Sequence, residues 1–123
     1  MNKSFNIWGR DFDLKVIFDV YEDESVLEAQ EAALINFEKN ADKLLNSSKD
    51  IEKYCIKIDG DRIGKKIDNI FKYVMPQSIL IKRTDKKRIV VLLCNYRFDE
   101  EHGIAMVFEN EKLCMIGTQD ELL

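Results

Sequence analysis

The sequence predicts an α+β fold: an antiparallel meander of about four C-terminal strands and one or two N-terminal strands, with two or three helices between them packed on one face. Three observations predict it. Apolar and polar residues alternate near both ends of the chain, as in half-buried strands. Apolar residues in the middle recur at spacings of three and four, as on helices. One proline and five glycines in 123 residues indicate short connections. Helices grouped apart from strands are typical of the α+β class.

The length and composition predict a single domain, residues 1–123. No apolar run is long enough to cross a bilayer, and the N-terminus lacks the pattern of a signal peptide. We therefore expect a cytoplasmic protein with no membrane contact. The cysteines, Cys55, Cys94 and Cys114, have no CxxC spacing and stand among apolar neighbours, which predicts buried, reduced thiols. A net charge of −4 argues against nucleic acid as a partner.

The N-terminal region predicts a hairpin of two strands. Phe5, Ile7 and Trp8 favour a short first strand that turns at Gly9-Arg10. Residues 12–21 alternate cleanly and predict a second strand. Its inward face consists of Phe12, Leu14, Val16, Phe18 and Val20.

A helix is expected next, because Ser25 and Glu28 have the spacing of a capping box. Its apolar stripe consists of Leu27, Gln30, Leu34, Phe37, Ala41 and Leu44, and Asn46-Ser47-Ser48 ends it.

Two further helices are predicted before the C-terminal strands. Asp50 caps the first, and its inward face consists of Ile51, Tyr54, Cys55 and Ile58. After the turn Asp59-Gly60-Asp61, a last helix carries Ile63, Ile67, Ile70, Phe71 and Val74 and stops at Met75-Pro76.

Four strands are expected in the remaining chain, in two pairs joined by short turns. Strands over residues 78–83 and 88–98 flank a polar turn at 84–87. Residues 89–94 are apolar on both faces, which is typical of a central strand. Strands over residues 103–109 and 112–118 pair across Asn110-Glu111.

The loop Asp99-Glu100-Glu101-His102 contains ligand types for a divalent cation, and His102 could act as a general base near neutral pH. A metal site needs three or four converging ligands, so others would come from residues such as Asp120 or Glu121. Alternatively, Asp99 caps the turn through backbone amides and Gly103 supplies a positive φ. We favour the structural alternative.

Folding leaves only a few residues near the C-terminus unexplained, and they form the candidate functional cluster. They are Arg97, Asp99, Glu101, His102, Gln119 and Asp120.

Two other charge clusters each have a structural and a functional interpretation. Residues 82–88 carry five positive charges, which suit either a solvated turn or an anion contact, and we favour the turn. The acids Asp19, Glu22, Asp23, Glu24 and Glu28 crowd the junction between the second strand and the first helix. They suit a helix N-terminus, but an acidic rim could also attract a basic partner.

The C-terminal residues form a distinctive set of short motifs: Tyr96-Arg97-Phe98-Asp99, Glu101-His102-Gly103-Ile104-Ala105, Val107-Phe108-Glu109-Asn110-Glu111 and Ile116-Gly117-Thr118-Gln119-Asp120. With these motifs the chain resembles a family of small bacterial proteins of unknown function. The resemblance covers most of the chain and is specific in its last thirty residues. Glu100 stands where the family pattern has proline. Related families are linked to immunity proteins that neutralise toxins. The resemblance implies no catalytic residues.

No nucleophile elbow, phosphate-binding loop, dinucleotide fingerprint or zinc-protease motif is present, so an enzyme is not favoured and no cofactor is expected. We expect a non-catalytic protein-binding module, of the immunity type, whose partner is a basic toxin domain. The alternative is a metal-binding protein or metal-dependent enzyme that uses Asp99, Glu101 and His102. The sequence leaves the oligomeric state open.

Overall fold

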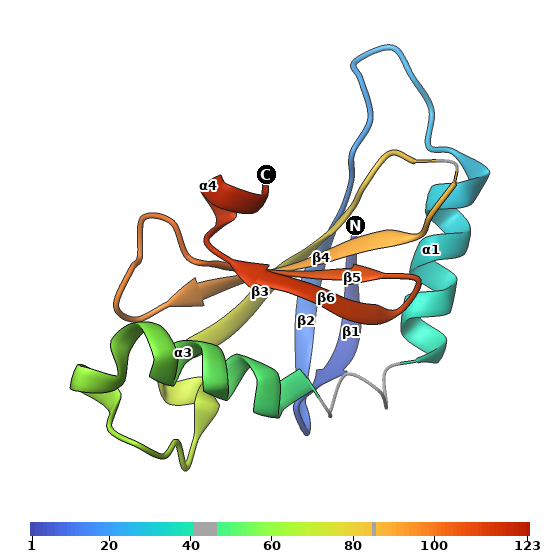
Figure 1. The fold of residues 1–123 in the computed structure, drawn as a ribbon. Coiled ribbons are helices and arrows are strands. Elements are labelled where there is room, and N and C mark those ends of the chain that lie inside the picture. Colours follow the sequence, from blue (N-terminus) through green and yellow to red (C-terminus); the bar gives the residue numbers. More distant parts are fainter. Residues whose placement is uncertain (41–46, 85) are drawn as a thin grey trace.

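A six-stranded sheet forms the centre of the fold, and its strand order follows the chain (Figure 1). The computed structural model of the protein describes residues 1–40, 47–84 and 86–123. The strands are β1 (Asn2–Ile7), β2 (Arg10–Phe18), β3 (Val74–Ile81), β4 (Ile89–Tyr96), β5 (Ile104–Glu109) and β6 (Lys112–Gly117). The helices are α1 (Glu28–Lys39), α3 (Ser47–Ile63), the 3-10 turn η1 (Ile70–Lys72) and α4 (Gln119–Leu122). The α+β fold class is therefore confirmed.

The sheet is mixed, so the expected antiparallel meander is only part of it. Strands β3 to β6 pair antiparallel in chain order, and β1 pairs antiparallel with β2. Strand β2, however, pairs parallel with β3. A parallel pair needs a long crossover connection, and α1, α3 and η1 lie in the one between these two strands.

Two tight hairpins close the outer strand pairs. Trp8 and Gly9 connect β1 to β2, and Asn110 and Glu111 connect β5 to β6, with positive φ at all four residues. This backbone geometry matches the right-handed twist of the strands. The first turn lies one residue earlier than predicted, because Arg10 already pairs with Ile7.

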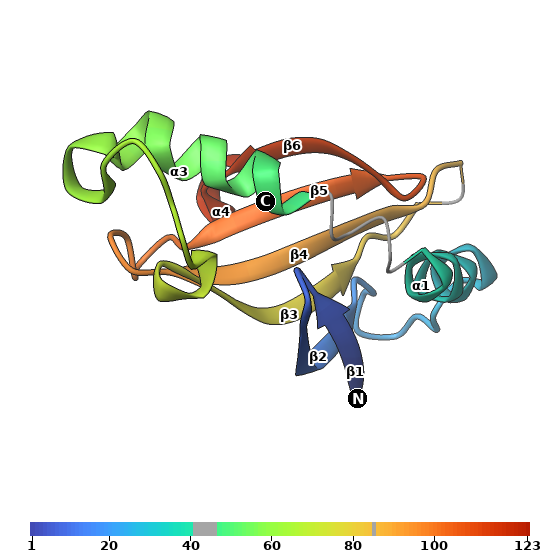
Figure 2. The same cartoon turned by 90° about the horizontal axis from the view of Figure 1, so that it is seen from below.

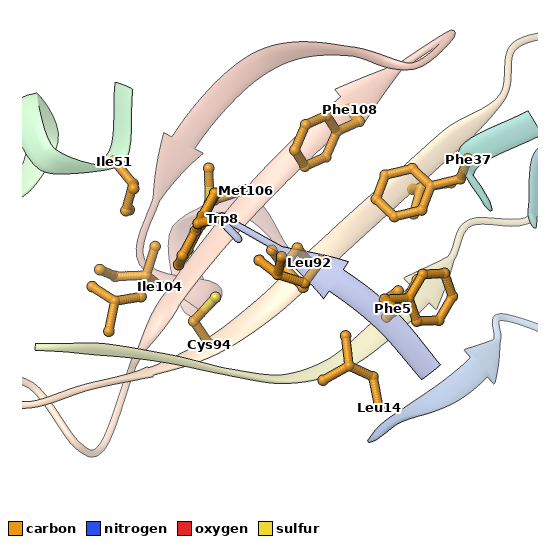
Figure 3. Close-up of a cluster of buried hydrophobic side chains, with 14 of the residues drawn as sticks. Phe5, Trp8, Leu14, Phe37, Ile51, Leu92, Cys94, Ile104, Met106 and Phe108 are labelled. Carbon is orange, nitrogen blue, oxygen red and sulfur yellow. The ribbon is translucent and has the colours of Figure 1, made fainter. Parts of the chain in front are cut away.

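The main core lies between the sheet and the helices α1 and α3, which are placed towards opposite ends of the sheet (Figures 1 and 2). Figure 3 shows Leu92 and Met106 of the central strands in this core. Phe37 of α1 packs edge-on against Phe108, with ring centroids 5.4 Å apart. Ile51 brings α3 into the same core and is fully buried.

The opposite face of the sheet holds a smaller apolar cluster. Val91, Ala105 and Val107 form it, and Leu122 of α4 packs against them. Helix α4 was not predicted, and it means that the helices do not all lie on one face. A single helical turn is too short to produce a visible periodicity in the sequence.

Helix α1 begins later than the predicted capping box. Its N-cap is Leu27, and Gln30, not Glu28, reaches back: the side-chain oxygen of Gln30 accepts a hydrogen bond from the Leu27 amide at 2.9 Å. Gln30, Leu34 and Phe37 are buried, as the stripe predicts. The stripe positions Ala41 and Leu44, and Asn46, lie outside the described residues.

Strand β2 ends at Phe18, so the prediction that it continues to Tyr21 with Val20 facing inward is wrong. The next predicted boundary is also wrong, because Ser47 and Ser48 begin α3 instead of forming a loop.

The predicted third helix does not exist. Helix α3 runs through the expected turn to Ile63, with a break in its geometry at Asp59 (φ −134°, ψ 29°). Gly64, at φ +99°, then ends it in the left-handed conformation typical of a helix C-terminus. Val74 begins β3, which also includes Pro76; a proline is tolerated there because the strand register shifts between Pro76 and Ser78.

Across the described parts of the chain, no helix combines the length and the apolar character that crossing a membrane requires.

Candidate functional site

The loop between β4 and β5 is a compact turn organised by Asp99. Its carboxylate accepts a hydrogen bond from the His102 amide at 3.2 Å and lies 3.0 Å from His102 Nδ1. Its backbone carbonyl accepts from the Gly103 amide at 2.9 Å. Both features of the structural alternative are therefore present: Asp99 caps the turn, and Gly103 has a φ of +60°.

The ring of His102 is more basic than an isolated histidine. The hydrogen bond to Asp99 raises its pKa first, and the negative charges of Asp120 and Asp99 raise it further. The pKa of Asp120 is lowered in turn, first by the nearby Thr118 hydroxyl and then by the positive charge of His102. Asp99, His102 and Asp120 thus form one electrostatic group at the surface.

Gln119 joins this loop to the sheet. Its side-chain amide donates to the Cys94 carbonyl at 3.2 Å, and its backbone amide donates to the His102 carbonyl at 3.2 Å. Gly103 lies in the same contact: a Cβ at this position would stand 2.5 Å from the Cys94 carbonyl oxygen. A side chain at residue 103 would therefore separate β4 from the start of α4.

Two members of the candidate cluster lie apart from this group. Glu101 is exposed, and it is the last and smallest of the influences on His102. Arg97 is also exposed and lines a separate hollow of about 420 Å³ beside Tyr73 and Met75. Among the residues that the structure describes, no set of three or more His, Cys, Asp and Glu side chains could hold a metal ion.

The cysteines offer no activated thiol. Burial raises the pKa of Cys55 to about 12 and also raises the pKa of Cys94. Cys114 is exposed on the edge strand β6, so the expectation that all three are buried is wrong for this residue. Its Sγ donates to the Val107 carbonyl at 3.3 Å.

The acids at the start of the crossover lie on an exposed loop, residues 19–25, which we call the acidic loop. All seven residues are exposed, and Figure 1 shows the loop extending well beyond the end of β2. It carries Asp19, Glu22, Asp23 and Glu24. Between them stand two exposed apolar side chains, Val20 at 37% and Tyr21 at 73% exposed. A hollow of about 290 Å³ lies beside Tyr21.

Two side chains hold the acidic loop in place. Gln30, only 1% exposed, donates from its amide nitrogen to the Asp19 carbonyl at 3.0 Å and to the Ile81 carbonyl at 3.2 Å. Arg83 pairs with Glu24 and donates to the Ser25 carbonyl at 3.0 Å. The loop is therefore anchored at both ends while Tyr21 remains exposed.

Three of the five cations in residues 82–88, which we call the basic turn, form ion pairs within the molecule. Besides Arg83, Lys87 pairs with Glu109 at 2.8 Å, and Arg88 makes a two-bond pair with Glu111 at 2.8 and 3.0 Å. These pairs favour the structural interpretation of residues 82–88.

The sequence did not single out Tyr21, nor a second group of residues near Asp99. Asp59, at the break in α3, accepts a hydrogen bond from the buried Tyr96 hydroxyl at 2.6 Å. The two residues are 37 positions apart, and only the fold brings them together.

The fold and these contacts define a small α+β protein with an anchored acidic loop and a C-terminal turn organised by Asp99. The chain belongs to the family described as Domain of unknown function (DUF6985), whose model matches residues 1–123. No curated protein and no solved structure matches the chain.

Gly103→Ala should lower the free energy of unfolding by more than Gly9→Ala. Both glycines have positive φ, which disfavours alanine by about 1–2 kcal/mol. Only at Gly103 does the added Cβ also meet backbone, whereas nothing lies within 4 Å at Gly9. Urea unfolding of both variants measures the difference. Equal losses would show that the contact between Gly103 and Cys94 is not tight.

The pKa of His102, followed by NMR titration, should lie above its ordinary value of about 6.5. Asp99→Asn should return it towards that value, because the hydrogen bond to Asp99 is the largest influence. Glu101→Gln, the control, should change it least.

The raised pKa also predicts how stability depends on pH. Protonated His102 stabilises the fold; this contribution is complete below about pH 6.5 and is lost as the pH rises through the pKa of the folded state. The stability advantage of the wild type over His102→Gln should therefore shrink as the pH rises above about 6.5. An advantage that grows with pH would contradict the assignment.

Proposed function

We propose that the protein is a non-catalytic protein-binding module of the immunity type, which uses the acidic loop to bind a basic protein such as a toxin domain. The observation that carries the proposal is Tyr21: a large aromatic side chain, 73% exposed, on an anchored loop among acids. Exposed aromatic residues are frequent anchors in protein interfaces.

The anchoring supports binding because it reduces the loss of conformational entropy on association. Gln30 and Arg83 fix the two ends of the loop in the free protein. A turn within the loop, in which the Glu24 amide donates to the Tyr21 carbonyl at 3.0 Å, further limits its conformations. Loops that are already ordered bind more tightly than loops that order on binding.

The charges support a basic partner. Of the acids in the loop, only Glu24 pairs with a cation among the described residues, which leaves Asp19, Glu22 and Asp23 to face solvent. Acidic groups around an aromatic anchor speed the association of a positively charged surface and discriminate against acidic proteins. A net charge of −4 acts in the same direction.

The test is affinity capture from the source organism with the immobilised full chain, followed by binding measurements with the purified captured protein. Tyr21→Ala should weaken binding about 30-fold, as loss of an interface anchor does. The double variant Glu22→Gln/Asp23→Asn should slow association and reduce its dependence on salt.

The matched control is Glu100→Gln/Glu101→Gln, which removes two neighbouring exposed acids from a different loop. It should bind like the wild type. The proposal fails if no basic protein is captured, or if the captured protein binds wild type and Tyr21→Ala equally well.

A further inference from the structure

A pocket of about 230 Å³ lies between α3 and the loop organised by Asp99. Its walls include the aromatic side chains Tyr54, Tyr96 and Phe98, together with the carboxylates of Asp59 and Asp99. This volume is well above the roughly 10–15 Å³ that one water molecule needs on the same measure, so a small ligand group fits. Helix α3, which forms one wall of the pocket, lies at a different end of the molecule from the acidic loop (Figures 1 and 2).

We propose that this pocket binds an organic cation, a guanidinium or primary ammonium group. Aromatic rings and carboxylates together are the surroundings that proteins use for such cations, because ring faces and carboxylate oxygens both carry negative charge. The proposal does not depend on the protein-binding role of the acidic loop.

Asp59 provides the first argument. One of its carboxylate oxygens accepts from Tyr96, and no described residue donates to the other. The break in α3 at Asp59 places this carboxylate in the pocket wall. An oxygen with spare acceptor capacity in a pocket suits a ligand that donates hydrogen bonds.

Arg62 provides the second argument, because the protein already places a cation on this wall. Its guanidinium lies over the ring of Phe98, 5.3 Å from the centroid. It pairs with neither Asp59 nor Asp99 in the described structure, although all three residues line the pocket. The exposed Arg62 therefore occupies one ring face and leaves the carboxylates open to another cation.

The electrostatic surroundings of the pocket also favour a cationic ligand. The pKa of Tyr54 is raised, first by burial and then by negative charge that includes Glu121, Asp59 and Asp99. The pocket is thus in a negative field even with Arg62 at its wall. An anionic ligand would be repelled by these carboxylates, and an apolar ligand would strip them of water without compensation.

Thr118 adds a polar group to the same pocket. Its hydroxyl oxygen is buried and has no hydrogen bond of good geometry within the described residues, although it is close enough to Asp120 to lower the pKa of that carboxyl.

The experiment is an NMR titration of the full chain with butylguanidinium, compared with 1-butanol and butyrate of the same chain length. The cation should give saturable shifts at Asp59, Phe98 and Thr118. The alcohol and the anion should not. Saturable binding of butyrate, or equal shifts with butanol, would overturn the proposal.

Asp59→Asn should weaken butylguanidinium binding about tenfold, because it removes the charge but keeps an acceptor for Tyr96. The matched control is Asp61→Asn, an exposed acid on the same helix that does not line the pocket, and it should bind like the wild type. Equal binding by both variants would overturn the assignment of Asp59.

Arg62→Gln separates the proposal from effects on folding. Removing the guanidinium from Phe98 frees the ring face and removes a positive charge, so butylguanidinium should bind more tightly, by about threefold or more. A variant that merely loosens the fold would not bind better. Loss of binding in Arg62→Gln would contradict the proposal.

The source of the cation is distinguished by a second probe, the peptide acetyl-Gly-Arg-Gly-amide. Binding as tight as that of butylguanidinium supports the arginine side chain of a protein as the ligand. Binding of butylguanidinium alone supports a small free molecule.

Discussion

The side chain of Gln30 joins three parts of the fold that the chain order alone would leave separate. Its amide nitrogen donates to the carbonyls of Asp19 and Ile81, the first residue after β2 and the last residue of β3. Its oxygen accepts from Leu27, where α1 begins. The parallel pair of β2 and β3, the helix α1 and the base of the acidic loop therefore meet at a single buried amide. A buried amide with all three of these bonds made is stabilising, but each bond lost leaves a polar group without water.

The cations of the basic turn, residues 82–88, form ion pairs within the molecule. Arg83 pairs with Glu24, Lys87 with Glu109 and Arg88 with Glu111. Such surface pairs contribute little stability individually, typically below about 1 kcal/mol. Their effect is to neutralise the turn beside the acidic loop, so that the loop presents negative charge and Tyr21 to solvent.

Local patterns in the sequence predicted much of the fold. The alternation around Leu14 and Val16 and the stripe through Leu34 and Phe37 describe buried faces correctly, because these faces depend on neighbours within one element. The parallel pairing of β2 with β3 is a tertiary property that no local pattern carries. The third helix was predicted because apolar residues from Ile63 to Val74 recur at helical spacings. The structure instead buries Ile67 from an irregular segment, Ile70 from a 3-10 turn and Val74 from the start of β3.

The candidate site was predictable to a similar extent. Asp99 and Gly103 could be recognised as a turn because both contribute through local backbone geometry. The alternation over residues 12–21 already predicts that Tyr21 faces outward, but its place on a loop among acids follows only from the end of β2 at Phe18. The pocket at Asp59 could not be recognised either, since its walls come from α3, β4, β5 and two loops, and only the fold brings α3 to the others.

The role of Gln30 is tested most directly by the variant Gln30→Met. It should change both the free energy of unfolding and the order of the acidic loop. Methionine keeps the size of the side chain and removes its hydrogen bonds. The free energy of unfolding should fall by about 1–3 kcal/mol, since the Asp19 carbonyl loses its donor. Backbone amides of residues 20–25 should at the same time lose NMR order, while those of β4 and β5 should not. Unchanged stability and an equally ordered loop would contradict the role given to Gln30.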